Sequence, residues 1–138
     1  MSPRVRIALA AAMVAALAPP AAAEDVGFEL RVADHVEVAA GAAGTVSLTV
    51  VPTAGRSVSG DGPLRIELSA GDGLTLPRRR YERRDAADPA AEAPRFELRF
   101  RGAAPGRHPL RIAVRFWLCR EKTCRPAGAE RTVTVEVR

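Results

Sequence analysis

The sequence predicts an all-β fold, and three observations lead to that prediction. Apolar and polar residues alternate in eight short segments, as they do in strands that bury one face. A glycine- or proline-containing turn closes most of these segments. No apolar repeat of helical spacing follows the first 23 residues of the 138-residue chain, in which 47% of residues are hydrophobic and 27% charged. Those proportions are ordinary for a globular domain with a packed core.

The N-terminal segment is typical of an export signal. Two arginines precede an apolar run at 7–18, and small residues at 21–23 follow two prolines. A basic start, a short apolar run and an A-x-A cleavage site together characterise secretory signal peptides. The apolar run is too short to span a hydrocarbon core of about 30 Å as a helix. We therefore expect a Sec-type signal peptide over 1–23, and a periplasmic or secreted domain over 24–138 with no membrane span.

The first predicted strands lie directly after this signal. Apolar residues at alternate positions indicate strands at 28–32 and 36–38. A third strand at 46–51 should stop at Pro52, because proline cannot donate to a ladder of backbone hydrogen bonds. A Gly-Asp-Gly-Pro turn then leads into a fourth strand at 64–68.

The second half of the chain continues the pattern. A Gly-Asp-Gly turn precedes a short strand at 74–76, and alternation returns at 96–101. The intervening residues 85–94 are rich in Ala, Asp and Pro, which predicts an exposed loop. The longest alternating run is 110–118, and the last strand is predicted at 132–137.

Seven or eight short strands, each with one buried face, fit a particular architecture. Such spacing predicts an immunoglobulin-like antiparallel β-sandwich, in which two sheets pack their apolar faces together. An eight-stranded barrel is the alternative. The chain shows no internal repeat and no second domain.

The two cysteines are the candidate functional residues. Cys119 and Cys124 are the only cysteines, and an even number in an exported chain predicts a disulfide. Because they lie five positions apart after the longest predicted strand, the bond would clip a hairpin rather than join two sheets. Closing so small a ring stabilises a fold by only about 2 kcal/mol in the chain-entropy model. Two interpretations stay open: a structural clip, and a reversible pair that exchanges with another dithiol.

Cationic residues and a tryptophan lie close to the two cysteines in the sequence. Arg120, Lys122 and Arg125 flank the two sulfurs, and cationic neighbours favour the thiolate that attacks disulfides. Trp117 is out of phase with its apolar neighbours, so we expect it to face away from the core. An outward tryptophan beside a disulfide is either an anchor for a partner protein or a side chain covered by a neighbouring loop.

The end of the chain resembles a known family. The long strand that enters Cys119, the short polar bridge to Cys124, the following Pro126 and the last alternating strand resemble the N-terminal periplasmic domain of DsbD. That family passes reducing equivalents from a transmembrane partner to periplasmic oxidoreductases through one cysteine pair on an immunoglobulin-like sandwich. The resemblance implies that one of the two cysteines attacks a partner's disulfide and the other resolves the mixed disulfide. The chain departs from the family in having only four residues between its cysteines and no aromatic residue at 57–62.

A run of arginines is the second feature. Five of them lie within seven residues, at Arg78, Arg79, Arg80, Arg83 and Arg84. Such a run could contact an anionic surface such as lipid headgroups, or could be a solvated loop or strand edge. A nucleic-acid partner is not expected, because the chain has an export signal and the run has one tyrosine rather than a stacking platform.

Other site chemistries are not indicated. His35 and His108 lie in separate segments, and no His-x-His or C-x-x-C cluster occurs, so we predict no metal site and no cofactor. The sequence at 55–59 begins like a G-x-S-x-G nucleophile elbow but lacks its final glycine. A hydrolase is therefore not expected.

These observations lead to one leading hypothesis and one alternative. The leading hypothesis is an exported thiol–disulfide exchange domain, an electron relay that resembles the DsbD N-terminal domain and uses Cys119 and Cys124. Its partner would be a thioredoxin-like or other envelope protein. The alternative is a non-catalytic β-sandwich module that binds an envelope protein and carries a structural hairpin disulfide.

Overall fold

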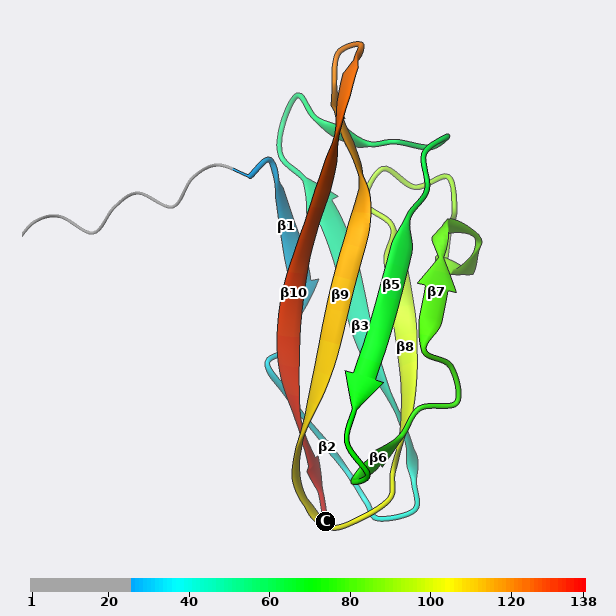
Figure 1. Cartoon of the computed structure of the whole chain (residues 1–138), viewed down its shortest axis with the longest axis vertical. Coiled ribbons are helices and arrows are strands. Elements are labelled where there is room, and N and C mark those ends of the chain that lie inside the picture. Colours follow the sequence, from blue (N-terminus) through cyan, green and yellow to red (C-terminus); the bar gives the residue numbers. More distant parts are fainter. Residues whose placement is uncertain (1–25) are drawn as a thin grey trace, which may run out of the picture.

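A computed structural model describes residues 26–138, which form two facing β-sheets (Figure 1). The predicted signal peptide at 1–23 lies outside the described residues. The strands, in chain order, are β1 (Phe28–Val32), β2 (His35–Val38), β3 (Ala43–Pro52), β4 (Ser57–Val58), β5 (Arg65–Ala70), β6 (Leu74–Thr75), β7 (Arg80–Glu82), β8 (Arg95–Gly102), β9 (Gly106–Arg120) and β10 (Thr123–Val137). One 3-10 turn, η1 (Arg83–Asp85), follows β7. Within residues 26–138, no helix has the length and apolar character needed to cross a membrane.

The strand order is that of an immunoglobulin-like sandwich. One sheet has the order β1-β3-β8-β6, and the other has the order β2-β10-β9-β5-β7, with β4 also pairing with β9. These orders match the two sheets of immunoglobulin domains, in which the last two long strands and one central strand form the second sheet. The predicted fold class is therefore confirmed. One pair departs from the predicted antiparallel arrangement, because β2 runs parallel to β10.

All eight predicted strands are present, and the described residues contain two more. The additional strands β4 and β7 have two and three residues, so they are too short to show alternation. β10 also begins at Thr123 rather than near 132. Residues 123–132 show no alternation because none of them is fully buried. The hydrophobic pattern therefore cannot detect this half of the strand.

The core lies between the two sheets and is made of the apolar residues that the alternation predicted. Within the described part of the chain, no polar or charged residue is buried. The largest fully buried side chains are Phe96, Phe100, Leu48, Ile66, Leu98, Leu110 and Ile112. Because they come from strands of both sheets, the two layers are held together by apolar packing.

β9 and β10 form a long hairpin that extends beyond the rest of the sandwich, at the top of Figure 1. Their pairing runs from Gly106 opposite Val137 to Arg120 opposite Thr123. A two-residue turn closes the hairpin, and its first residue, Glu121, has a φ of 55°. That left-handed conformation costs a non-glycine residue about 1–2 kcal/mol.

The outer edge of β10 is open along the projecting half. β2 pairs only with residues from Thr134 onward, so 123–133 have no neighbour strand on that side. The Thr134 N–H donates to Asp34, away from β9, and alternate residues of β10 share this direction. Pro126 is one of them, so its missing N–H falls at the open edge. A proline there discourages unwanted strand pairing without removing a bond to β9.

Truncation of a core phenylalanine should show how far the packing stabilises the fold. We expect Phe96→Ala to lower the free energy of unfolding by about 3–5 kcal/mol, because it removes a fully buried ring and leaves a cavity. Urea unfolding followed by circular dichroism measures this change. Arg99→Ala is the control, because its side chain is exposed on the same strand, and it should change the free energy by less than about 0.5 kcal/mol.

Candidate functional site

The two cysteines form a disulfide at the tip of the β9–β10 hairpin. Cys119 and Cys124 lie directly opposite each other, one pair away from the turn, with their Cα atoms 4.0 Å apart. The predicted disulfide is therefore confirmed, and it links adjacent strands of one sheet. Neither cysteine belongs to the cluster of core residues between the two sheets.

The two halves of the disulfide differ in exposure. Cys119 is only 9% exposed, whereas Cys124 is an exposed residue. The difference follows from the neighbours of each strand. Ser57 of β4 pairs with β9 directly beside Cys119, but no strand lies beside Cys124 on the open edge of β10. An approaching protein thus meets Cys124 first.

Positive charge surrounds the hairpin tip. Arg120 and Lys122 are exposed next to the two cysteines. The guanidinium of Arg125 donates to the carbonyl oxygen of Val26 at 3.0 Å, which ties the projecting strand to the segment before β1. Only Glu121 carries the opposite charge among these residues of the turn and its flanks. The turn and its flanks therefore carry three basic residues against one acidic residue.

Trp117 faces away from the core, as the sequence predicts. It is 37% exposed and lies opposite Pro126 on the outer face of the hairpin. The loop between β4 and β5 covers part of its indole ring. A Cβ atom at Gly62 would lie 3.2 Å from the Trp117 side chain, so a larger residue there would have to displace the indole slightly. The loop therefore supports the indole but leaves more than a third of the residue accessible.

An open groove of about 950 Å³ begins at Trp117. Its floor is the outer face of β9, from Ala113 through Arg115 to Trp117. The β4–β5 loop and the end of β7 border one side, and residues 126–130 of β10 border the other. The lining comes from four separate segments, so the sequence alone does not reveal the groove. The outward Trp117 and the small residues at 127–129 are the only signals of it in the sequence.

The groove and the disulfide share one face of the hairpin. Successive pairs along this face are Cys119 with Cys124 and then Trp117 with Pro126. Positions two residues apart on a strand are separated by about 7 Å. Trp117 and the disulfide are therefore neighbours along this face.

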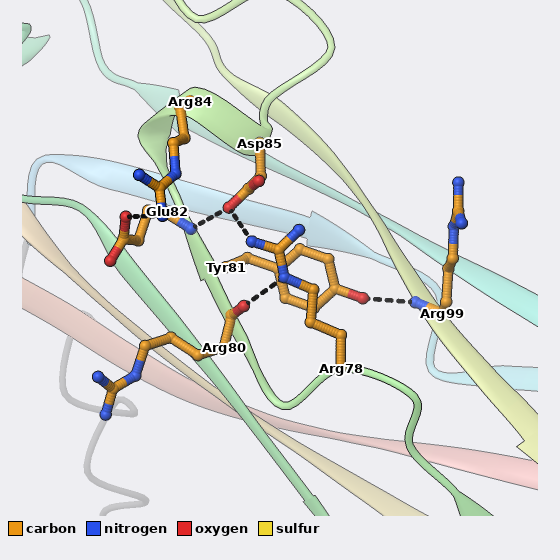
Figure 2. A network of polar contacts seen from close by, with 7 residues as sticks. All are labelled: Arg78, Arg80, Tyr81, Glu82, Arg84, Asp85 and Arg99. Carbon is orange, nitrogen blue, oxygen red and sulfur yellow. Dashed lines mark hydrogen bonds and ion pairs between the residues drawn. The ribbon is translucent and has the colours of Figure 1, made fainter.

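The arginine run is largely engaged in contacts within the domain (Figure 2). The guanidinium of Arg78 lies over the ring of Tyr81, 4.8 Å from its centroid, and pairs with Asp85 at 2.7 Å. Arg84 pairs with Glu82 at 3.1 Å. Arg80 similarly pairs with Glu67, and Arg83 donates to the carbonyl oxygens of Ser59 and Pro89. Of the five arginines, only Arg79 has a side chain that makes no hydrogen bond or ion pair within residues 26–138. Two members of the run, Arg83 and Arg84, line one wall of the groove.

Asp85 is the centre of this network. One of its carboxylate oxygens accepts hydrogen bonds from the Glu82 N–H and from the Arg78 guanidinium, both at 2.7 Å. Burial acts to raise the pKa of Asp85, but these two hydrogen bonds and the charges of Arg78 and Arg84 outweigh it. The pKa of Asp85 is therefore lowered from its ordinary value of 3.8. The charged carboxylate holds η1, and with it the groove wall, in place.

Replacing Asp85 with asparagine should make stability less dependent on pH. A carboxylate with a lowered folded-state pKa stabilises the fold above its unfolded-state pKa and loses this contribution as pH falls through the folded value. We expect Asp85→Asn to cost about 1 kcal/mol at pH 7, because hydrogen bonds to a charged group are lost. The deficit should shrink below about pH 4, and urea unfolding at pH 7, 5 and 3 measures it. Asp72→Asn controls for the loss of a surface charge. An equal deficit at all three pH values would contradict the assignment.

The structure also gathers three potential metal ligands that the sequence analysis did not connect. His35 lies 3.6 Å from Glu37 and 3.3 Å from Glu136, where β2 runs beside β10. The guanidinium of Arg138 is 2.9 Å from Glu37 and 3.9 Å from Glu136. Both carboxylates therefore already have a cationic partner, and we interpret the cluster as an ion-pair network joining the two strands. His108 contacts the carbonyl oxygen of Ala104 in a turn instead.

Comparison with known proteins assigns no family. No protein family model and no curated protein matches the chain. Solved structures with a similar arrangement include PapD-like domain 7 of human CEP192, with 9% identity, a TM-score of 0.44, and coverage of 91% of this chain and 95% of that one. AggA, the major subunit of aggregative adherence fimbriae type I from Escherichia coli, has 9% identity, a TM-score of 0.40 and coverage of 80% and 94%. The CooA pilin subunit from enterotoxigenic Escherichia coli has 11% identity, a TM-score of 0.35 and coverage of 81% and 99%. At these values the likeness implies no function, so function is argued from the site.

Proposed function

We propose that this protein is an exported thiol–disulfide exchange domain, an electron relay of the kind that the DsbD N-terminal domain performs. One observation carries the proposal: a disulfide lies at the exposed tip of a projecting hairpin, outside the core, with one half accessible. The signal-like sequence at 1–23 supports export, and a disulfide persists best in an oxidising compartment.

The disulfide contributes little to the stability of the fold at this position. Its two cysteines belong to strands of 15 residues each that already pair along their whole length. The bond closes a small ring, which limits its stabilisation to about 2 kcal/mol. A bond that adds so little to the fold is better explained by its reactivity.

The difference in exposure assigns the two sulfurs different roles. In the reduced domain, the accessible Cys124 thiolate attacks one sulfur of the partner's disulfide and forms a mixed disulfide, and the partner's other sulfur leaves as a thiolate. Cys119, as a thiolate, then attacks the Cys124 sulfur, restores the intramolecular disulfide and releases the partner's second thiolate. The domain loses two electrons and the partner gains them. Arg120 and Lys122 favour the thiolate forms that both attacks need.

The groove supports the alternative of a non-catalytic binding module. An exposed tryptophan at one end of an open groove is typical of an anchor site for another protein. In that case the disulfide would only hold the hairpin tip beside the groove. The two functions differ in the reduction potential of the disulfide, which decides between them.

The reduction potential should lie in the range of exchanging disulfides. We expect a value above about −300 mV, so that the domain equilibrates with thioredoxin at about −270 mV. Trp117 is the only tryptophan in the chain. Because it adjoins the disulfide, which quenches indole emission, its fluorescence should rise on reduction in dithiothreitol redox buffers. A potential well below −300 mV and no reaction with thioredoxin would support the structural clip.

Single-cysteine variants should separate the roles of the two sulfurs. We expect Cys119→Ala, which keeps the exposed Cys124, to form a mixed disulfide with glutathione disulfide at least about tenfold faster than Cys124→Ala, because thiol exchange requires access to the sulfur. Mass spectrometry of acid-quenched samples gives both rates. Equal rates would contradict the assignment of Cys124 as the attacking sulfur. A faster Cys124→Ala variant would assign that role to Cys119 instead. Circular dichroism checks that both variants remain folded.

A further inference from the structure

The groove beside the disulfide has a chemistry of its own. Trp117, Ala113 and the small residues of β10 make its centre apolar. Its charged lining residues are four arginines and two glutamates: Arg65, Glu82, Arg83, Arg84, Arg115 and Glu130. With four arginines against two glutamates, the charged part of the lining is positive overall.

Arg115 lies on the floor of the groove, and its guanidinium can bind an acidic group of another protein. Arg84 pairs with Glu82, Arg83 donates to two carbonyl oxygens, and Arg65 lies 3.9 Å from Glu67. The side chain of Arg115, in contrast, makes no hydrogen bond or ion pair within residues 26–138. Its strand position is two residues from Trp117 on the same face, opposite Gly128, which has no side chain to cover it. An apolar contact point and an unpaired guanidinium therefore lie side by side in the groove.

We propose that this groove is the docking surface for a thioredoxin-like oxidoreductase, and this inference rests on the proposed function. The partner would place an apolar side chain against Trp117 and a carboxylate against Arg115, beside its own cysteines. Because the groove and the disulfide share one face of the hairpin, this contact brings the partner's reactive sulfur to Cys124. A partner with an acidic group beside an apolar side chain would complement the groove, and such complementarity raises the rate of encounter and fixes the orientation.

Docking predicts that protein and small-molecule reductants respond differently to changes in the groove. Dithiothreitol needs only access to Cys124, whereas a docked protein also needs the groove. We expect Trp117→Ala and Arg115→Glu each to slow reduction by reduced thioredoxin by about tenfold or more, as loss of an interface anchor does. Reduction by dithiothreitol should change by less than about twofold, because small thiols respond to the sulfur's own access and chemistry. Alkylation of quenched samples followed by gel shift measures both rates.

A matched variant controls for charge. Arg111 lies four residues before Arg115 on the same strand and the same outer face, but outside the groove. Arg111→Glu therefore makes the same charge change without touching the docking surface, and the thioredoxin rate should stay within about twofold of the unmodified domain. The rate with the unmodified domain should also fall as salt is added, because salt screens charges at the surface.

The outcomes distinguish the inference from the function on which it rests. If thioredoxin reduces the unmodified domain and both groove variants at the same rate, the docking surface is wrong and the exchange function stands. If Arg111→Glu slows the reaction as much as Arg115→Glu, the rate depends on the overall charge of the domain, and the proposed docking surface is again contradicted. If dithiothreitol reduces the disulfide but thioredoxin does not, the proposed function itself fails.

Discussion

The register between β9 and β10 is the constraint on which the rest of the molecule depends. Side chains alternate across a strand, so this pairing sends Phe116 and Leu118 into the core and their neighbours Trp117 and Cys119 to the outer face. A slip of one residue would exchange the two sets. The apolar packing between the sheets therefore fixes more than stability. It also determines that the disulfide, the tryptophan and the groove lie on one accessible face.

The surroundings of the hairpin determine which parts of that face are accessible. β4 lies beside Cys119 and its following loop supports Trp117, while the contacts of Asp85 hold the wall that η1 forms. On the other side, β10 has no neighbour over 123–133, so Cys124 stays exposed. One edge is covered and the other is open. This asymmetry is the physical origin of the different roles proposed for the two sulfurs.

The sequence predicts the fold well and the site only in part, for reasons that particular residues show. Strands that bury one face, such as 96–101, can be predicted from the alternation of apolar and polar residues. The outward direction of Trp117 follows from the same pattern. Residues 123–132 form half of β10 without an alternation of large apolar residues, because only Ala127 and Ala129 pack against the core there and neither is fully buried. The groove is missed because its lining combines four distant segments. Which cysteine is exposed depends on the pairing of Ser57 with Cys119, and no local pattern contains that pairing.

The separation of the disulfide from the core has a consequence for the proposed exchange cycle. A relay domain must remain folded while its disulfide is open, or each turnover would expose apolar surface. Here the bond contributes at most about 2 kcal/mol, against a typical domain stability of about 5–15 kcal/mol. The backbone pairing of the hairpin with β2, β4 and β5 does not pass through the sulfurs, so we expect it to persist after reduction. Reduction should thus change the reactivity of the tip while leaving the sandwich, and the groove that it carries, in place.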